Sequence, residues 1–562
     1  MTNYDIADNF ALLGKLMDIH GDNSFKSKSY AAAAFNIEKL PMQLADTPAD
    51  KLFAIKGIGD AIGKKILEQL ETGQLSLLNE YISKTPPGII EMLNIKGLGP
   101  KKISTIWKEL EIETIGELLY ACNENRLTLY KGFGEKTQNN IKESIDFYLG
   151  NIGNYLYQQI ETYALAIDEK LRSSFTGNHF LLTAAFRRQL EIIEQLEWVT
   201  TVSHTALKDF FTANAFDTIA DSEQYVSFKG KENVTLGFYC TDADHLYTQL
   251  FATSCSEAFL TAWKDKYGWD ANHAYSSEEA IFTERNIQFI PAFEREEGSV
   301  IDKAIQHQLP VVIQPTDIKG IIHSHSKWSD GVNTLDEMAR AAIQQGLEYL
   351  VISDHSKTAF YANGLNEERI IAQHQQVDEL NSKLAPFKIF KSIESDILND
   401  GNLDYSNEVL NSFDIVIGSV HSNLKMTEEK AMMRLMKAIG NPYTSILGHM
   451  TGRLLLSRSG YPVDHKKIIE ACAANNVVIE LNAHPRRLDM DWRWIGYALD
   501  KNVLISIDPD AHSTEGYHDC RYGVLAAQKA GVTGRQNLSS YSLQEFEQFV
   551  ATQKAKRNAP NP

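Results

Sequence analysis

The segment 321–331 reads Ile321-Ile322-His323-Ser324-His325-Ser326-Lys327-Trp328-Ser329-Asp330-Gly331. Its apolar start predicts a β-strand, and side chains two positions apart on a strand point to the same face. We therefore expect His323 and His325 to point the same way, which suits a metal ion. An isolated His-x-His pair is weak evidence, so the prediction depends on whether other candidate ligands have a similar placement.

Further candidate ligands each follow, or end, a short apolar run of the same kind. They are His355 after 349–352, Glu394 within 390–394, His421 after 415–418, His449 after 445–448, and Asp510 with His512 after 503–507. Helix-length segments alternate with these runs from about 317 to about 532, which predicts a parallel α/β sheet or barrel. The carboxyl ends of such strands meet at one mouth, so these residues are expected to converge. Four other histidines of this half do not follow such a run and are left out of the metal site: His374, His465, His484 and His518. Of these, His484 is at most a substrate contact.

Three motifs of the C-terminal half resemble the polymerase and histidinol phosphatase (PHP) domain, in the version fused to bacterial family X DNA polymerases. They are Gly448-His449-Met450-Thr451-Gly452-Arg453-Leu454, Leu481-Asn482-Ala483-His484-Pro485-Arg486-Arg487-Leu488-Asp489 and Ile507-Asp508-Pro509-Asp510-Ala511-His512-Ser513. The resemblance covers nearly the whole chain and implies a distorted βα barrel over residues 317–550. It also implies metal ligands at His323, His325, Asp330, His355, Glu394, His421, His449, Asp510 and His512, and none of these positions has lost its ligand.

The implied ligands indicate metal-dependent hydrolysis of phosphoesters. Mixed imidazole and carboxylate donors suit two or three divalent ions of the Mn²⁺ or Zn²⁺ type, with Mg²⁺ as the alternative. Such ions activate a water molecule and stabilise charge on the phosphoryl group. The resemblance makes Glu394 the bridging, catalytic carboxylate. Arg453 is expected to hold a phosphate oxygen through two hydrogen bonds, and a surface ion pair is the other interpretation of this residue.

Residues 151–310 show a mixed α+β pattern and resemble the palm and thumb of family X polymerases. That family holds two metal ions with an Asp-x-Asp pair on one strand and a third Asp on a neighbouring strand. The matching positions here are Gln195, Glu197 and Thr235. Glutamine and threonine have no charge to balance two divalent cations, so metal affinity is expected to collapse. The palm is therefore predicted to be degenerate, with DNA synthesis lost or weak.

The first 150 residues read as short helices separated by glycine turns, and three turns share one frame. They are Ile55-Lys56-Gly57-Ile58-Gly59, Ile95-Lys96-Gly97-Leu98-Gly99 and Tyr130-Lys131-Gly132-Phe133-Gly134. Glycines two apart allow a tight turn that directs backbone N–H groups at a helix N-terminus toward an anion such as a DNA phosphate. These segments resemble helix-hairpin-helix motifs, which contact the backbone without reading bases. The predicted DNA contacts are Gly57, Gly59, Lys64, Lys65, Gly97, Gly99, Lys101, Lys102, Gly132, Gly134 and Lys136.

The surroundings of the first hairpin resemble the small N-terminal domain of family X polymerases. This resemblance implies an 8 kDa-like domain over residues 1–90, a fingers-like region over 91–150, and binding to a 5′-phosphate at a gap. Lys65 matches the Schiff-base lysine of family members with deoxyribose-phosphate lyase activity. A solvated or phosphate-contacting lysine is the other interpretation of this position.

Composition narrows the class of protein. The net charge of -18 argues against a protein that coats nucleic acid through bulk positive potential, so DNA contacts must come from local clusters of lysine. The five cysteines show no C-x-x-C spacing, which argues against a disulfide framework and a thiolate zinc site. No apolar run long enough to span a membrane is present, so a cytoplasmic monomer is expected. The polar tail from Ala551 to Pro562 is expected to fray.

We therefore predict a multidomain chain: an all-α helix-hairpin-helix region, an α+β palm and thumb over 151–310, and a C-terminal α/β barrel. The predicted function is 3′-end processing in DNA repair, on gapped, nicked or 3′-blocked DNA. Exonuclease, abasic-site endonuclease and 3′-phosphatase activities remain open. The alternatives are a gap-filling polymerase with a 3′–5′ exonuclease, a small-molecule phosphatase like histidinol-phosphate phosphatase, and a non-catalytic DNA-binding scaffold.

Overall fold

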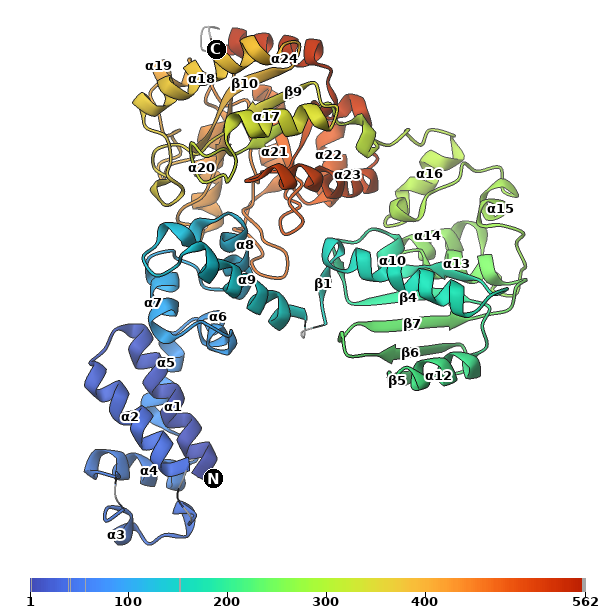
Figure 1. Cartoon of the computed structure of the whole chain (residues 1–562). Helices are drawn as coiled ribbons and strands as arrows, with labels where there is room; N and C mark the ends of the chain where they lie inside the picture. The colour runs from blue at the N-terminus through green and yellow to red at the C-terminus, as the bar shows by residue number, and fades with distance from the viewer. Residues whose placement is uncertain (2, 39, 41, 56, 151–152, 558–562) are drawn as a thin grey trace. The chain divides into compact units, whose positions relative to one another are not determined.

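The computed structural model describes residues 1, 3–38, 40, 42–55, 57–150 and 153–557 (Figure 1). Lys56 of the first hairpin lies outside the described residues, as do residues 151 and 152 at the predicted start of the palm. The chain forms two compact units, Met1–Asn123 with Leu127–Tyr148, and Glu124–Arg126 with Leu149–Pro562. None of the described helices is long and apolar enough to cross a membrane.

The first unit contains only helices among its described elements, as predicted. Its elements are α1 Asn3–His20, α2 Ser24–Glu38, η1 Leu44–Asp46, α3 Ala49–Leu52, α4 Asp60–Thr72, α5 Ser76–Lys84, α6 Pro87–Glu91, η2 Met92–Asn94, α7 Pro100–Lys108, α8 Ile115–Asn123, η3 Arg126–Leu129 and α9 Glu135–Gly150. Helices α1 and α2 pack together through the stacked rings of Phe10 and Tyr30, whose centroids are 5.8 Å apart. Apolar residues at helical spacing form this core.

The second unit begins with a mixed α/β region, also as predicted. Its elements are β1 Tyr155–Leu156, α10 Tyr157–Ser174, β2 Phe180–Leu182, α11 Ala184–Arg187, β3 Ile192–Ile193, β4 Gln195–Thr200, α12 His204–Ala213, β5 Asp217–Asp221, β6 Tyr225–Lys229, β7 Thr235–Cys240, α13 Leu246–Thr253, α14 Glu257–Tyr267, α15 Glu278–Thr283, η4 Ala292–Glu294, α16 Ser299–Ile305 and η5 Pro315–Asp317. The five-stranded sheet has the order β2-β4-β7-β6-β5, and β4 pairs with β7 in parallel. The predicted neighbouring palm strands are therefore adjacent.

Glu294 gives this region a predicted pH dependence. Its side chain is 7% exposed, and burial raises its pKa from 4.5 to about 7, although Lys303 opposes the shift. The folded state thus binds the proton more tightly than the unfolded state. Stability from this group is present below about pH 4.5 and is lost as the pH rises to about 7, by up to about 3 kcal/mol. We expect Glu294→Gln to raise the melting temperature at pH 8 and to leave it nearly unchanged at pH 4, and an equal effect at both pH values would contradict this.

The remainder of the second unit is a parallel barrel with alternating strands and helices. Its elements are β8 Gly320–Ser324, α17 Leu335–Gln344, β9 Tyr349–Ile352, η6 Phe360–Ala362, α18 Glu367–Leu384, β10 Lys388–Asp396, α19 Asn407–Leu410, β11 Ile415–Ser419, α20 Glu428–Ile439, β12 Ile446–Leu447, α21 His465–Asn475, β13 Val478–Asn482, α22 Trp492–Asp500, β14 Ile505–Asp508, η7 Thr514–Asp519, α23 Cys520–Lys529, η8 Gly534–Gln536, η9 Leu538–Ser540 and α24 Leu543–Arg557. The seven strands follow the order β8 to β14, and a parallel bridge between Ser324 and Ala511 nearly closes the sheet.

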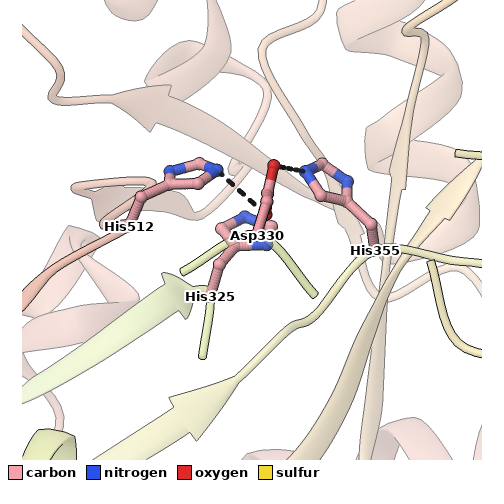
Figure 2. Close-up of side chains that lie close together, drawn as sticks. All are labelled: His325, Asp330, His355 and His512. Carbon is pink, nitrogen blue, oxygen red and sulfur yellow. Dashed lines mark ion pairs between the residues drawn. The ribbon is translucent and has the colours of Figure 1, made fainter. Parts of the chain in front are cut away.

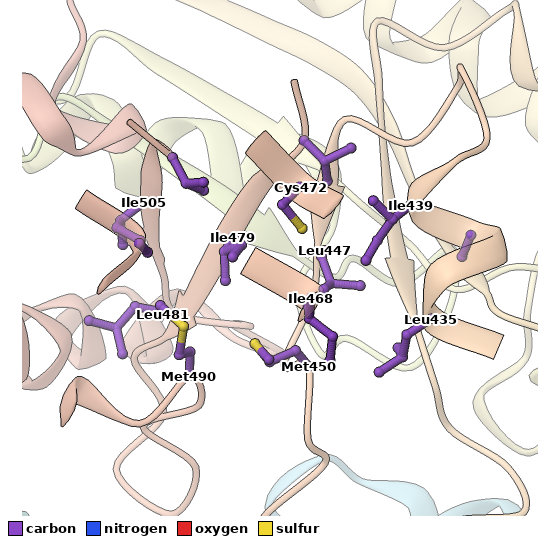
Figure 3. Packing of buried hydrophobic residues seen from close by; sticks show 14 of the residues in the cluster. Leu435, Ile439, Leu447, Met450, Ile468, Cys472, Ile479, Leu481, Met490 and Ile505 are labelled. Carbon is purple, nitrogen blue, oxygen red and sulfur yellow. The ribbon is translucent and has the colours of Figure 1, made fainter. Parts of the chain in front are cut away.

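The two faces of this sheet have separate apolar cores. On the outer face, residues such as Leu447, Ile479 and Ile505 pack with Leu435 and Ile468 of the helices (Figure 3). The inner face has another set, which packs against α24: Ile322, Tyr349, Val351, Phe390, Ile415, Ile417, Ile446 and Val478. Strand alternation separates the two sets, so residues two positions beyond an inner-face residue also point inward.

The expected fraying of the tail is wrong for residues 551–557. Helix α24 continues to Arg557, whose side chain donates to the backbone oxygens of Phe413 and Asp414. The helix is held because Phe546 and Val550 are buried against the inner face of the barrel. Residues 558–562 lie outside the described part of the chain.

Candidate metal centre

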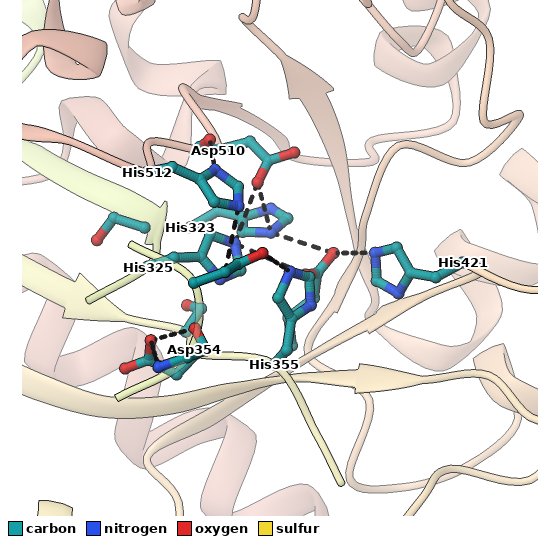
Figure 4. A network of polar contacts seen from close by, with 12 residues as sticks. His323, His325, Asp354, His355, His421, Asp510 and His512 are labelled. Atoms are coloured by element: carbon teal, nitrogen blue, oxygen red, sulfur yellow. Dashed lines mark hydrogen bonds and ion pairs between the residues drawn. The ribbon is translucent and has the colours of Figure 1, made fainter. Parts of the chain in front are cut away.

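The barrel brings the candidate ligands together at the carboxyl ends of its strands (Figure 4). His355, His421 and His449 each follow a strand by two or three residues, and Asp510 follows β14. Glu394 lies within β10. His355, Glu394 and His421 continue the inward alternation of Val351, Phe390 and Ile417, which explains why residues far apart in the sequence point into one site.

The His-x-His pair lies on an irregular strand, which corrects the expectation of regular alternation. Ile322 faces inward, so a regular strand would direct His323 outward. Instead, the register between β8 and β9 shifts between Ile321 and Ser324, and His323 has a φ of 58°. This bulge turns the imidazole inward, so that the rings of His323 and His325 are 5.3 Å apart. Asp510 also has a left-handed φ, of 52°, and backbone strain of this kind is concentrated at functional sites.

The Glu394 carboxylate lies at the centre of the cluster and is fully buried. Its Oε1 is 3.2 Å from His323 Nε2, 3.1 Å from His421 Nε2 and 3.0 Å from His449 Nε2. Its Oε2 is 2.9 Å from His355 Nδ1. One carboxylate therefore contacts imidazoles from four strand ends, as a bridging ligand would.

The ligand atoms form three groups whose members lie within 4.8 Å of one another: His325, Asp330, His355 and His512 (Figure 2); His323, His325 and Asp510; and His355, Glu394 and His421. His325 and His355 each belong to two groups. His449 joins the cluster through Glu394. The four histidines excluded in the sequence analysis belong to none of these groups. Each group offers three or four ligand atoms that could hold a metal ion.

Buried ligand atoms without hydrogen-bond partners support a fit between these residues and metal ions. Several buried atoms of the predicted ligands make no hydrogen bond within the described residues: His323 Nε2, His325 Nδ1, both Asp330 oxygens, both His355 ring nitrogens, Glu394 Oε2, His449 Nδ1 and His512 Nε2. Buried polar atoms without partners are rare and require an explanation such as a bound ion. Imidazole nitrogen and carboxylate oxygen are also donors that Mn²⁺ and Zn²⁺ accept.

The pKa values of the clustered histidines are shifted in opposite directions. Burial lowers the pKa of His325 to about 3, and its neighbours His512 and His355 act in the same direction. Burial also disfavours charge on His421, but Glu394 and Asp396 reverse that effect and raise its pKa to about 10. Protons thus neutralise part of the buried negative charge, and divalent cations would take their place on binding.

Two carboxylates outside the predicted ligand set contact ligand imidazoles. Asp396 Oδ1 is 2.5 Å from His421 Nδ1, and Glu480 Oε2 is 2.5 Å from His323 Nδ1. Neither residue was predicted from the sequence. For Asp396 a signal existed, because it lies two positions after Glu394 and so shares its face of β10.

Arg453 has a set of internal partners. Its Nε donates to the backbone oxygen of Arg487 at 3.0 Å, its Nη1 contacts Asp491 at 2.5 Å, and its Nη2 donates to the backbone oxygen of Leu488. These contacts brace the loop 487–491. The expected contact between Arg453 and a phosphate stays a prediction, and it would require the guanidinium to exchange some of these partners.

The palm positions lie on the neighbouring strands β4 and β7. Gln195 pairs with Thr235, and Glu197 with Gly237, across the parallel β4 and β7. Glu197 accepts a hydrogen bond from Tyr239 at 2.9 Å, and burial raises its pKa. The ring of Tyr225 covers Gly237. Within residues 153–310, all of which are described, no group of three candidate metal ligands occurs.

The three glycine hairpins share one geometry. Gly57, Gly97 and Gly132 have φ values of 93°, 90° and 96°, a conformation that glycine adopts without strain. In each hairpin the buried residue between the glycines donates its N–H to a backbone oxygen three positions earlier: Ile58 to Ile55, Leu98 to Ile95 and Phe133 to Tyr130. Recurrence of this turn supports a shared role for the three segments.

The second glycine of each pair leads into a helix. Gly59 and Gly99 are the N-caps of α4 and α7, and Gly134 directly precedes α9. The first turn of a helix has N–H groups without intrahelical acceptors and favours anions. Lys64, Lys101 and Lys136 are exposed on these helices, whereas Lys65 and Lys102 are half-buried. Lyase chemistry at Lys65 stays a prediction.

Comparison with known proteins agrees with this organisation. Family models match at residues 1–75 (helix-hairpin-helix domain), 89–146 (SAM-like helix-hairpin-helix tandem) and 322–484 (PHP domain). The chain is 30% identical to the DNA polymerase/3′-5′ exonuclease PolX of Bacillus subtilis, over 98% of this chain and 99% of that protein. It is 29% identical to a probable phosphatase of Caldanaerobacter subterraneus, over 28% of this chain and 60% of that protein. It is 25% identical to the probable phosphatase YcdX of Escherichia coli, over 41% of this chain and 82% of that protein.

Proposed function

Because this chain belongs to the bacterial family X DNA polymerases with a C-terminal PHP domain, we propose that its barrel is a 3′–5′ exonuclease that processes DNA ends in repair. The observation that carries the proposal is the convergence of buried histidine and carboxylate side chains on Glu394. The names of the Bacillus relative and of the phosphatase relatives support hydrolysis of phosphoesters.

The cofactors of the proposed reaction are two or three divalent ions, Mn²⁺ or Zn²⁺, with Mg²⁺ as the alternative. When bound, such ions supply a nucleophilic water near neutral pH and positive charge beside the phosphoryl oxygens. The three ligand groups would hold them. Glu394 would bridge neighbouring positions, because its two oxygens face different histidines. Burial of the cluster would keep the ligand geometry fixed.

The proposed partner is DNA with a gap, a nick or a blocked 3′ end, bound by a monomer. The helix-hairpin-helix matches at residues 1–75 and 89–146 support DNA binding. Hairpin contacts to phosphates would bring the 3′ end to the barrel without base recognition.

Product analysis on end-labelled gapped DNA with Mn²⁺ tests the proposed reaction. We expect stepwise loss of 3′-nucleotides, with release of mononucleotides. Substrates with an abasic site or a 3′-phosphate, run in parallel, distinguish abasic-site endonuclease and 3′-phosphatase activities. Hydrolysis of a small phosphate monoester without action on any DNA substrate would contradict the proposal and favour a small-molecule phosphatase.

A second candidate function is gap-filling DNA synthesis, because the name of the Bacillus relative includes a polymerase. We predict that nucleotide incorporation on gapped DNA is absent or very weak. Gln195 and Thr235 hold no charge, and Glu197 is engaged by Tyr239, so two catalytic cations would lack their ligands. The measurement is primer extension with all four nucleotides and Mg²⁺ or Mn²⁺, after the exonuclease has been inactivated by Glu394→Ala. Template-dependent extension that Glu197→Ala abolishes would overturn this prediction.

A further inference from the structure

Strand β13 differs from the other six strands of the barrel, all of which lie in the described residues. Each of the others has at least one predicted ligand on it or shortly after it, whereas β13 has none. On its inner face, two positions after Val478, β13 has the carboxylate of Glu480 instead. This side chain is completely buried.

Glu480 accepts hydrogen bonds from three directions. Its Oε2 lies 2.5 Å from His323 Nδ1. Its Oε1 accepts from the backbone N–H of His449 at 3.0 Å and from Asn482 Nδ2 at 2.9 Å. One carboxylate thus contacts the ring of a ligand on β8 and the backbone of a ligand beyond β12. A carboxylate has only acceptors, so it matches three donors without conflict.

The contact with His323 determines which ring nitrogen faces the site. With Nδ1 directed at Glu480, Nε2 is directed at Glu394 Oε1 and Asp510 Oδ1, at 3.2 and 3.4 Å. This Nε2 is buried and makes no hydrogen bond within the described residues. A proton on Nδ1 leaves the Nε2 lone pair for a cation, as carboxylate partners of metal-binding histidines do. Asp396 has the same relation to His421, which follows β11.

We propose that Glu480 is a positioning residue of the metal centre: it fixes the orientation and tautomer of His323, and it ties the backbone of His449 to the same carboxylate. The proposal rests on the metal-dependent function proposed above. It assigns β13 a role in aligning ligands that come from strands on either side of the site. Glu480 contacts the ligands on the side that faces away from the metal site, so it acts through them and does not contact the substrate.

The test is Glu480→Gln in the full-length chain, with Mn²⁺ alone as the probe. Glutamine has one acceptor oxygen for three donors, and its NH₂ group would face a donor. We expect the Kd for Mn²⁺, measured by calorimetry on metal-free protein, to rise about 10- to 100-fold. The melting temperature of the metal-free protein is measured on the same preparation, because buried donors without acceptors also lower stability, and excess Mn²⁺ should restore exonuclease activity. A Kd equal to that of the wild type would overturn the proposal.

A matched control is Asp414→Asn, which makes the same carboxylate-to-amide change in the same barrel. Asp414 precedes β11 and accepts from the backbone of Lys391 at 2.9 Å, so it lies at the amino ends of the strands, away from the site. We expect it to leave the Kd for Mn²⁺ unchanged. If Glu480→Gln does not fold, Glu480→Asp provides the test, because its shorter side chain cannot reach all three donors. A Kd unchanged in that variant would also refute the role.

The outcomes separate this proposal from the proposed function. If wild-type protein binds no Mn²⁺ and cleaves no DNA, the metal-dependent function fails. If the wild type binds Mn²⁺ and both Glu480 variants bind it equally well, only the positioning role fails. A lower metal-free melting temperature with unchanged Mn²⁺ affinity would show a purely structural role and would refute the proposal.

Discussion

Replacing Glu394 by alanine is expected to abolish 3′-end cleavage, with a loss well beyond the roughly 10- to 100-fold that follows removal of an outer-sphere partner of a metal ligand. Its carboxylate contacts the rings of His323, His355, His421 and His449. Without it, neighbouring cations would have less negative charge between them, so both sites should loosen together. The measurement is cleavage of end-labelled gapped DNA beside the metal content of the same preparation.

Two further variants place this result in context. His323→Ala removes one terminal ligand and should lower metal content and cleavage. Arg453→Ala should be less harmful than Glu394→Ala, because its guanidinium braces a loop through Arg487, Leu488 and Asp491. Circular dichroism and melting curves control for folding. Cleavage retained in both Glu394→Ala and His323→Ala would place the hydrolytic centre elsewhere.

The convergence of the candidate ligands could be predicted because strand alternation is local, and because alternating strand-like and helix-like segments indicate a parallel sheet. The bulge at His323 could not, because it depends on how β8 pairs with β9. A regular strand would have directed this histidine away from the site. Nothing in the sequence around Ile322 and His323 indicates that the strand is irregular. The expectation that His323 and His325 lie close together is met, but the argument for it omitted the bulge.

The contact between Glu480 and His323 could not be predicted from the sequence. An acid within the apolar run 478–482 is visible in the sequence, but its partner His323 is 157 positions away. Only the nearly closed arrangement of the strands brings the two together. Asp396 was within reach of the sequence, because its separation from Glu394 places both on one face. Contacts behind the ligands depend on tertiary structure more than the ligands themselves do.

In the palm, the pairing of β4 with β7 agrees with the family pattern, since Gln195 and Thr235 are register partners. The loss of charge at these positions could be read from the sequence. The hydrogen bond from Tyr239 to Glu197 could not, because a tyrosine two positions beyond Gly237 has many partners available in principle. This contact strengthens the prediction of lost synthesis, since it occupies the remaining acid.

Deleting residues 1–150 is expected to lower affinity for gapped DNA by about 100-fold or more near physiological salt, and to do so equally for unrelated sequences. The three hairpins repeat one glycine turn before a helix N-terminus, a geometry that favours anions, with glycine φ values of 93°, 90° and 96°. The net charge of -18 disfavours binding elsewhere through bulk potential. The measurement is a gel-shift or fluorescence titration of one gapped duplex in several base sequences.

Salt dependence tests whether these contacts are made to phosphates. Each neutralised phosphate steepens the fall of log affinity with log salt by about 0.9 in duplex DNA. The full chain should therefore show a steep slope and the deletion a shallow one.

A triple variant, Lys101→Gln, Lys102→Gln and Lys136→Gln, should reduce the slope while keeping the helices folded, because two of these side chains are exposed and the third is half-buried. Hydrolysis of bis(p-nitrophenyl) phosphate with Mn²⁺, which needs no DNA contact, should continue in this variant and so separates binding from chemistry. Affinity and slope that match those of the full chain in both proteins would show that the hairpins do not hold the DNA.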